Sequence, residues 1–432
     1  MGAVNECFAM KVALIGNMNN NFFSLTRYLR DEGIDAELIV VGEENTHFGP
    51  ESDAYTDDYL HYTKFPDWIR KGCFTENKDF QQEMKSLLQG YDFLIGCGYA
   101  PFFADRYGFK LDIVVPYGDD LYRLPFPKPE PGRFSKLLLL LDACWRRTTG
   151  QDFVMKFLRR LNVSNYYHLY RAYKLAWHQR RGLQYSTKLA MFAGTSDFDL
   201  ILSRLGLENK LCNIPFPIVY HRQYTEPELQ NHRTSLAFFA DFYRLRQQKK
   251  ILIFHHARHI WFSHLDEFSN KGNDVLFRGL AQYIEMSKMK DIGIVTVDYG
   301  PDVEHSRRLI ADLGIAEHVL WLPKMARKDI MALLPQVDIG ANCFSKSWLS
   351  GGVMYEFMAM GIPILQHREN TNHDVFPVLA ANNATDVATW LARSVAGDPI
   401  IQLTGKQAQH WYETTVVSKS VDFYVQSIKK RC

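Results

Sequence analysis

The stretch from Val337 to Gln366 constrains the fold most, because its pattern fits a strand, a loop, a helix and a second strand in that order. Val337–Ala341 is a short apolar run typical of a buried strand. After a loop rich in Ser and Gly, apolar residues recur at helical spacing in Val353–Met360. Gly361 suits the end of that helix, and Ile362–Leu365 predicts the next strand. The chain therefore contains at least one strand–helix–strand unit of α/β type.

The start of this predicted helix is an expected anion site. The first turn of a helix has free N–H groups, and the backbone of Ser350, Gly351, Gly352 and Val353 would be open to a phosphate. Glu356 follows one turn later, and its carboxylate can accept hydrogen bonds from two adjacent hydroxyls such as those of a ribose. Taken alone, the same residues also fit an ordinary strand–helix–strand unit with a solvated glutamate.

The run GGVMYEFMAMGIPIL resembles the nucleotide-sugar loop and helix of two-domain glycosyltransferases with the GT-B fold, in particular the large retaining family numbered four. In that family two glutamates stand eight positions apart, and Glu356 matches the second. Trp348 occupies the position of the first, so the glutamate that usually handles the donor sugar or supports the loop is missing. The resemblance implies an α/β fold class with two Rossmann-like, doubly wound parallel sheets facing a cleft.

Two cations precede this stretch and fit a diphosphate site. Arg258 follows the predicted strand Ile251–His256, and Lys271 opens the next predicted helix. In the resembled family an Arg after this strand and the Lys of a Lys-Gly pair contact the donor diphosphate. Fixed cations stabilise the charge that develops on a leaving nucleoside diphosphate without a metal. Ala257 replaces the family's usual Gly, and for either cation alone a plain surface position is the alternative.

The resemblance also implies contacts to the base and to the acceptor. Lys324 and Met325 follow a predicted strand where these enzymes meet the base through main-chain groups. Near the N-terminus, Lys11–Ile15 predicts a strand, and Asn17 and Asn19 in the following loop are candidates for hydrogen bonds to acceptor hydroxyls. Asn residues also simply suit a tight turn. The loop GNMNNN is not a GxGxxG fingerprint, so a dehydrogenase is disfavoured.

Asp119 is the candidate catalytic residue. It lies in the loop YGDDLYRLPF after the predicted strand Asp112–Pro116, and ligands bind beyond strand ends in open α/β sheets. It would act as a base, as a hydroxyl anchor or as a stabiliser of developing positive charge, and Asp120 is a weaker candidate. The structural alternative is a helix cap or an Asx-turn.

The stretch 133–188 departs from the rest of the chain in charge. It has twelve basic and two acidic residues, a net charge of +10, whereas the whole chain carries +2. Basic and aromatic residues alternate at helical spacing, which predicts a basic helical insertion that contacts anionic lipid. A solvated insertion remains the alternative. Nucleic acid is not expected as a partner, because no recognised binding motif accompanies the charge.

No metal or cofactor is expected. His255 and His259 have HxxxH spacing but lie on a predicted strand and loop, and Asp197 and Asp199 precede a helix that they would cap. Seven scattered cysteines, no signal-peptide pattern and no long apolar run predict a cytoplasmic protein, with a peripheral position on the inner face of the membrane as a further option.

We predict three parts from these patterns. Residues 1–218 form an acceptor-side Rossmann-like domain with the insertion 133–188, residues 219–410 form the nucleotide-sugar domain, and 411–432 form a helix that crosses back. The predicted function is transfer of a sugar from a nucleotide-diphosphate sugar to a hydroxyl of a glycan, a lipid-linked acceptor or a cell-envelope precursor. Retention of configuration follows only if the family's stereochemistry carries over. A nucleotide-sugar epimerase or hydrolase and a non-catalytic carbohydrate-binding protein are the alternatives.

Overall fold

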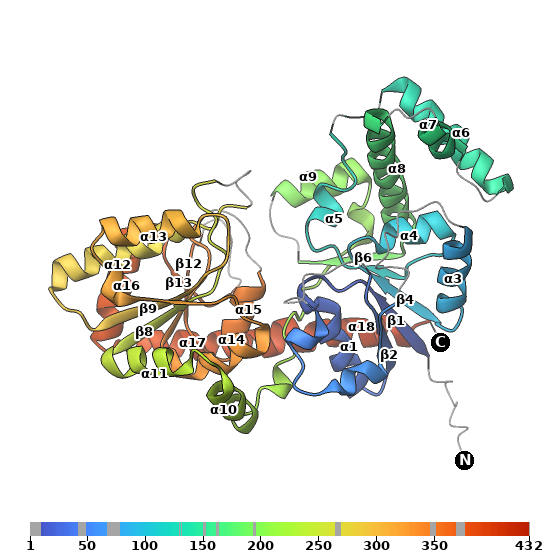
Figure 1. Ribbon diagram of the computed structural model, residues 1–432. Coiled ribbons are helices and arrows are strands. Elements are labelled where there is room, and N and C mark those ends of the chain that lie inside the picture. Colours follow the sequence, from blue (N-terminus) through green and yellow to red (C-terminus); the bar gives the residue numbers. More distant parts are fainter. Residues whose placement is uncertain are drawn as a thin grey trace, which may run out of the picture. The chain divides into compact units, whose positions relative to one another are not determined.

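The fold is described from a computed structural model of the 432-residue chain (Figure 1). The structure describes residues 10–431, apart from 42–48, 67–77, 129, 131, 150–152, 161–163, 193–195, 264–268, 346–350 and 369–375. The chain divides into two compact units. Unit 1 comprises Met1–Asn45, Thr56–Phe216 and Lys419–Cys432, and unit 2 comprises Thr46–Tyr55 and Pro217–Ser418.

Unit 1 is built on a seven-stranded sheet with the order β3-β2-β1-β4-β5-β6-β7, in which the paired strands run parallel. The strands are β1 (Lys11–Ile15), β2 (Asp35–Ile39), β3 (Thr63–Lys64), β4 (Phe93–Gly96), β5 (Ile113–Val114), β6 (Lys188–Met191) and β7 (Leu211–Asn213).

Helices cover both faces of this sheet (Figure 1). They are α1 (Asn21–Asp31), α3 (Lys78–Leu88), α4 (Ala100–Tyr107), α5 (Asp119–Tyr122), α6 (Arg133–Thr149), α7 (Phe153–Arg160), α8 (Ser164–Tyr185), α9 (Ser196–Leu205) and α18 (Lys419–Lys429). Short 3-10 turns in unit 1 are Met18–Asn20, Asp57–His61 and Glu208–Lys210, and those in unit 2 are Pro50–Ser52, His221–Gln223, Ala316–His318 and Leu334–Gln336.

Unit 2 contains a six-stranded parallel sheet with the order β10-β9-β8-β11-β12-β13. Its strands are β8 (Ile251–His255), β9 (Ile292–Val297), β10 (Val319–Leu322), β11 (Ile339–Ala341), β12 (Ile364–Gln366) and β13 (Leu379–Ala380). Its helices are α10 (Glu226–Ser235), α11 (Phe239–Gln248), α12 (Asn273–Ser287), α13 (Val303–Asp312), α14 (Arg327–Leu333), α15 (Gly352–Ala359), α16 (Ala384–Val395) and α17 (Pro399–Trp411).

The central strands are apolar over most of their length because both faces of each sheet are covered. Val12–Ile15 in β1 and Leu252–Phe254 in β8 are fully buried, as expected for parallel strands packed between two helix layers. Each unit has its own core, one around Phe103 and one around Phe277. The predicted α/β class with two parallel sheets is confirmed.

Two details differ from the predicted organisation. The C-terminal stretch 411–429 is not one α-helix, because Trp411 ends α17 and a π-helical segment, Tyr412–Ser418, precedes α18. The segment Thr46–Tyr55 comes from the N-terminal part of the chain yet belongs to unit 2. Lys328 anchors it there by donating from Nζ to the carbonyls of Glu51 and Ala54 at 3.0 and 3.2 Å.

Candidate functional site

The strand order of unit 2 creates a switch point between β8 and β11. From β8 the chain adds β9 and β10 on one side of the sheet and then β11, β12 and β13 on the other. The loops after β8 and β11 therefore leave the sheet in opposite directions at its carboxyl edge, which is where open α/β sheets bind ligands. The two loops contain Arg258, Lys271 and the start of α15, the residues that the sequence predicts for the diphosphate.

Backbone contacts hold these two loops together. The carbonyl of Lys271 accepts a hydrogen bond from the N–H of Phe344 at 2.8 Å. Gly272, at the start of α12, has a left-handed φ of 60°, and a Cβ there would lie 2.9 Å from the carbonyl carbon of Phe344. Both the conformation and the close approach require glycine at this position. The Lys-Gly pair thus places Lys271 beside the loop that leads to α15.

The side chain of Asn273 fixes the loop that carries Arg258. Its Oδ1 accepts from the N–H of Ile260 at 3.0 Å, and its Nδ2 donates to the carbonyl of Arg258 at 3.3 Å. Asp302 holds the next residues by accepting from the backbone N–H groups of 261, 262 and 263. Burial raises the pKa of Asp302, but the hydroxyl of Ser263 and these N–H groups outweigh it and lower the pKa to about 2. Arg258 itself is exposed on a loop with a fixed backbone.

Gly351 precedes α15, and Gly352 is its first residue. Among the described residues, a Cβ on Gly351 would meet no heavy atom within 4 Å, whereas a Cβ on Gly352 would lie 3.7 Å from Nη2 of Arg327. The helix begins one residue before the predicted Val353, which is half-buried. Ser350 lies outside the described residues. The first-turn N–H groups therefore lack a capping side chain from Gly351 and suit an anion.

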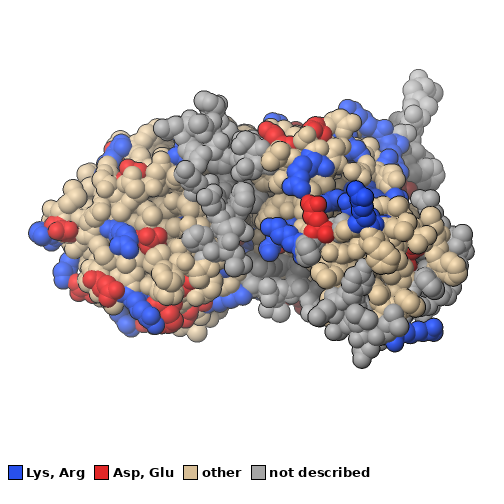
Figure 2. All heavy atoms as spheres, turned by 90° about the horizontal axis from the view of Figure 1, so that it is seen from above, with Lys and Arg blue, Asp and Glu red and all other residues tan. Residues whose placement is uncertain are grey.

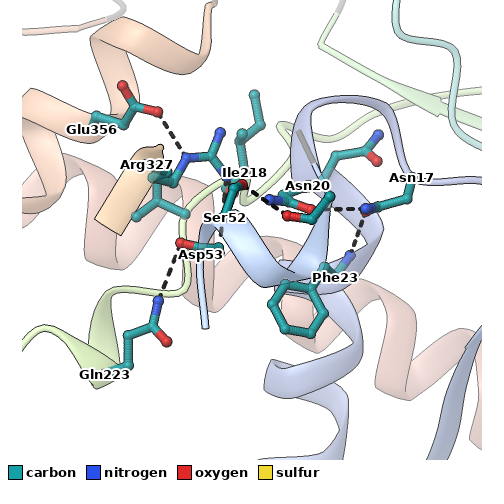
Figure 3. Close-up of polar contacts among 12 residues, drawn as sticks. Asn17, Asn20, Phe23, Ser52, Asp53, Ile218, Gln223, Arg327 and Glu356 are labelled. Carbon is teal, nitrogen blue, oxygen red and sulfur yellow. Dashed lines mark hydrogen bonds and ion pairs between the residues drawn. The ribbon is translucent and has the colours of Figure 1, made fainter. Parts of the chain in front are cut away.

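Glu356 lies one turn into α15, and both of its carboxylate oxygens already have partners. Its Oε1 accepts from Nε of Arg327 at 2.8 Å (Figure 3). Its Oε2 lies 2.7 Å from Nε2 of His256. The three side chains are buried. Burial raises the pKa of Glu356, but the charge of Arg327 and the bond to His256 outweigh it and hold the pKa at about 2. The carboxylate is ionised at neutral pH and clamps α15 to α14 and to the end of β8.

Arg327 extends this cluster to two other segments. Its Nη1 donates to the carbonyl of Ile218 at 3.2 Å and lies 4.0 Å from Oδ2 of Asp53 (Figure 3). Asp53 is fully buried and also accepts from Gln223 at 3.2 Å and from the hydroxyl of Tyr224. Burial alone would lower the pKa of Arg327. Glu356, Asp53 and Tyr224 outweigh this effect and raise the pKa above its ordinary value, so the guanidinium stays charged.

Sequence reasoning missed this cluster. Arg327 and Asp53 are far apart in the chain, and no motif in the sequence connects them. The sequence offers one signal, an Asp within an irregular aromatic stretch. Such a residue does not indicate which side chain it pairs with.

The base-contact candidates lie beyond β10. Lys324 is exposed and its Nζ lies 4.9 Å from the ring centre of Tyr299, whereas Met325 is buried. Arg327 follows as the first residue of α14. The loop with the two base candidates thus leads directly into the residue that clamps Glu356.

Unit 1 has its own switch point, between β1 and β4, and the Asn-rich loop leaves the sheet there. Asn17 is buried; its Nδ2 donates to Oδ1 of Asn20 at 2.8 Å, and its Oδ1 accepts from the N–H of Phe23 at 3.0 Å (Figure 3). Asn19 has a left-handed φ of 52° and donates to the hydroxyl of Tyr117 at 3.2 Å. Both residues shape the turn, so any acceptor contact would use groups that already have protein partners.

The two neighbouring aspartates after β5 differ sharply. Asp119 is exposed and lies 3.4 Å from Nη1 of Arg123 in an i,i+4 pair. Asp120 is buried and accepts from the N–H groups of Gly98, Tyr117 and Gly118, each at 2.9 Å. Burial raises the pKa of Asp120 to about 6, although these N–H groups oppose the shift. Asp120 therefore joins the loops after β4 and β5, and Asp119 is the aspartate that faces solvent.

The histidines after β8 form a buried polar cluster. Nδ1 of His255 and Nε2 of His259 lie 3.1 and 2.9 Å from the hydroxyl of Thr296, and Nδ1 of His259 lies 2.9 Å from the hydroxyl of Ser306. Burial lowers the pKa of His259 to about 4, so both rings are neutral at pH 7. Within the described part of the chain, no three His, Cys, Asp or Glu residues converge to hold a metal ion.

Comparison with known proteins identifies the fold. No model of a protein family matches the sequence, and no curated protein matches it. Among solved structures, a glycosyltransferase from Rickettsia africae matches 98% of this chain and 99% of its own, with a TM-score of 0.59 and 14% identity. Anabaena HepE with bound UDP matches 98% and 100%, with a TM-score of 0.56 and 13% identity. The chain has the GT-B fold.

A third similar structure is sucrose-phosphate synthase from Thermosynechococcus elongatus, with 98% of each chain covered, a TM-score of 0.53 and 11% identity. These identities are low, so what the GT-B neighbours share with this chain is the fold. The expected GT-B resemblance is confirmed at the level of the fold.

Proposed function

We propose that this GT-B protein transfers a sugar from a nucleoside-diphosphate sugar to a hydroxyl group of a second sugar. The observation that carries the proposal is the switch point of unit 2. There the loops after β8 and β11 leave the sheet at its carboxyl edge; the first carries Arg258 and Lys271, and the second leads to the glycine-led start of α15. Two cations and a helix N-terminus stabilise the charge that develops on a departing diphosphate.

The structural neighbours support this choice of substrates. HepE has been seen with UDP, with UDP and glucose, and with UDP-glucose. A trehalose-phosphate synthase from Burkholderia xenovorans, with a TM-score of 0.56 and 12% identity, is a UDP-forming enzyme seen with glucose-6-phosphate. By analogy we assign a nucleotide-sugar donor and a sugar acceptor to this chain, with Lys324 and Met325 beside the base and Asn17, Asn19 and Asp119 on the acceptor side.

We further propose that transfer retains the anomeric configuration and needs no metal, because the cations of unit 2 can take over charge neutralisation. The acceptor hydroxyl then attacks from the face that the diphosphate leaves, and a phosphate oxygen of the leaving group accepts its proton. Asp119 would orient the acceptor. Among the described residues, no helix is long and apolar enough to span a bilayer; contact with a membrane through 133–188 is proposed separately below.

Glu356 could contact the ribose of the donor, or it could only position α15. The structure gives it an ion pair with Arg327 and a bond to His256, and each carboxylate oxygen keeps a second lone pair for a ribose hydroxyl. A nucleotide that lacks the 2′-hydroxyl distinguishes the roles. If Glu356 contacts ribose, the wild type binds UDP more tightly than 2′-deoxy-UDP, and Glu356→Gln reduces that preference. If Glu356 only positions α15, the variant weakens both nucleotides equally.

A thermal-shift screen of nucleotide sugars tests the proposal before any acceptor is known. At a ligand concentration one hundred times Kd, binding adds about 2.7 kcal/mol to the stability of the folded state. We expect one nucleotide series to raise Tm and its sugar to be transferred when acceptor sugars are added. Donor cleavage or epimerisation without acceptor would indicate a hydrolase or an epimerase, and binding with no turnover across acceptors would indicate a non-catalytic protein. A screen in which no nucleotide raises Tm contradicts the proposal.

A further inference from the structure

Helix α6 exposes most of its large apolar side chains to solvent, whereas a helix that packs on a protein core buries them. Five of them are between 49% and 65% exposed: Phe134, Leu137, Leu140, Leu141 and Trp145. Positions 134, 137, 141 and 145 are three or four residues apart, so they form one stripe along the helix, and Leu140 borders it. We call these five residues the α6 apolar face.

The opposite side of α6 is packed and partly polar. Ser135, Leu139 and Asp142 are buried there. Asp142 forms an ion pair with Lys174 of α8 at 3.1 Å, and its other oxygen accepts from the N–H of Val154 in α7 at 3.1 Å. This buried ion pair fixes which side of the helix points inward. Turning α6 to bury the apolar face would move Asp142 away and leave Lys174 without its partner. The outward position of the apolar face is therefore built into the fold.

The three helices stand on a rigid base. Leu139, Val154, Leu158, Tyr170 and Tyr173 form a small core of their own between α6, α7 and α8. The C-terminal half of α8 is fastened to the rest of unit 1 by Gln179, which donates to the carbonyls of Gly98 and Asp120, each at 3.0 Å. In Figure 1, α6 and α7 lie at the outer end of α8, away from the sheet.

Some of the described basic residues of 133–188 are used inside the fold, and others face solvent. Lys174 pairs with Asp142, and Arg181 pairs with Asp105 at 3.0 Å, so these two cations serve the fold. Arg133, Lys136, Arg160 and Arg171 are exposed, and the first two lie on α6 itself, next to the apolar face. Figure 2 looks onto this end of unit 1, where blue basic side chains lie beside a broad uncharged area. The surface thus combines apolar side chains with a basic border.

We propose that the α6 apolar face inserts into the headgroup region of an anionic lipid bilayer, with Arg133 and Lys136 contacting lipid phosphates. An amphipathic helix with Leu, Phe and Trp on one side and cations beside them lies in the plane of such an interface. A second copy of this chain fits the face less well, because two stretches with a net charge of +10 would repel each other. The inference does not depend on the donor site of unit 2.

Vesicle sedimentation with the full chain tests the inference. The probes are vesicles of phosphatidylcholine alone and of phosphatidylcholine mixed with phosphatidylserine, both at physiological ionic strength. We expect the wild type to bind the mixed vesicles more tightly. A variant with Leu137→Ser, Leu141→Ser and Trp145→Ser is expected to bind them at least about tenfold more weakly.

The matched control replaces three exposed apolar residues outside the insertion, Leu200→Ser, Met286→Ser and Leu403→Ser, which are 65%, 80% and 48% exposed. It is expected to bind like the wild type. Unchanged thermal unfolding and unchanged nucleotide binding of the α6 variant show that it is folded. Equal vesicle binding by the two triple variants overturns the inference, and so does a wild type that ignores mixed vesicles or that forms a dimer abolished by the α6 substitutions.

Cys144 provides a site-specific readout, because it is an exposed cysteine on α6. An environment-sensitive fluorophore attached there, in a chain whose Cys7, Cys73, Cys212 and Cys432 are serine, should shift to the blue when mixed vesicles are added. The same label at position 200, in a Leu200→Cys chain that also carries Cys144→Ser, should not shift. Equal shifts at the two positions would contradict insertion through α6.

Discussion

The two switch points of this molecule are each organised around a buried carboxylate, but the carboxylates are held in different ways. In unit 1, Asp120 accepts from three backbone N–H groups, and burial raises its pKa to about 6. In unit 2, Glu356 is held by Arg327 and His256, and its pKa is about 2. Both carboxylates tie loops together, but only the second does so with a cation, Arg327.

The difference shows that the same strand topology can present cations at one switch point and amides and hydroxyls at the other. Around Glu356 the buried carboxylate neutralises Arg327, while Arg258 and Lys271 stay on the loops above the strand ends. Around Asp120 the neighbouring groups are amides and hydroxyls such as Asn19 and Tyr117. Cations and helix N-terminal N–H groups suit a diphosphate, and amides and hydroxyls suit sugar hydroxyls.

The largest expected effect is the loss of Arg327. Arg327→Ala leaves Glu356 and Asp53 buried without their shared cation, and breaking a buried pair costs about 3–5 kcal/mol in the free energy of unfolding. Urea denaturation measures this. The control is Arg244→Ala, which removes an exposed i,i+3 pair and should change stability by less than about 1 kcal/mol. Equal stability of the Arg327 variant and the wild type would show that the cluster does not hold unit 2 together.

The next effect is an acid-dependent loss of stability that belongs to Glu356. Its pKa in the folded state lies below the ordinary value of 4.5, so its ion pair stabilises the protein above that value and the contribution is lost as the pH falls towards 2. The free energy of unfolding should therefore fall more steeply from pH 5 to pH 3 in the wild type than in Glu356→Gln. Parallel curves would mean that the pair with Arg327 does not lower the pKa.

Asp120 should change the free energy of unfolding in the opposite direction as the pH rises. Its pKa rises from 3.8 to about 6 on folding, so the folded state binds more protons between these values and stability falls as the pH rises through them. The shift corresponds to roughly 3 kcal/mol. In Asp120→Asn this part of the pH dependence should disappear, which denaturation at pH 4 and pH 6.5 can measure. An unchanged difference between the two pH values would assign the effect to another group.

The smallest expected effect separates binding from folding. Gly351→Ala adds a methyl group that meets none of the described residues within 4 Å, at an extended backbone position. Because Gly is preferred to Ala at a helix N-cap, stability should fall by no more than about 1 kcal/mol. The same methyl group obstructs an anion at the helix start and should weaken nucleotide binding about tenfold. Gly90→Ala, also in open space but in unit 1, is the control and should leave binding unchanged. Unchanged binding by Gly351→Ala would remove this helix start from the site.

Local patterns made α15 predictable from the sequence. The helix was expected over 353–360 and is found over Gly352–Ala359, because its apolar spacing and its flanking glycines act within a few residues. The same holds for β8, expected over 251–256 and found over Ile251–His255. Arg258 was expected after this strand and Lys271 at the opening of the next helix; Arg258 lies in the loop after β8, and Lys271 lies two residues before the first residue of α12.

Contacts between distant segments were not predictable in this way. The clamp of Arg327 on Glu356 and Asp53 depends on tertiary packing, and neither the spacing nor the residue types around Arg327 indicate it. The basic stretch 133–188 shows the same limit, because its charge pattern predicted helices but not that Lys174 and Arg181 are used inside the fold. The sequence also did not indicate that the apolar face of α6 points outward, because this depends on the contacts of Asp142 with α7 and α8.

The most direct measurement is a calorimetric titration with the nucleoside diphosphate that gives the largest thermal shift. A variant with Arg258→Ala and Lys271→Ala loses two charge-assisted contacts of about 1.5–3 kcal/mol each, so its Kd should rise at least about hundredfold. The control, Arg278→Ala with Lys290→Ala, removes two exposed cations elsewhere in unit 2 and should leave Kd unchanged. A double variant that binds as tightly as this control would contradict the claim that Arg258 and Lys271 hold the diphosphate.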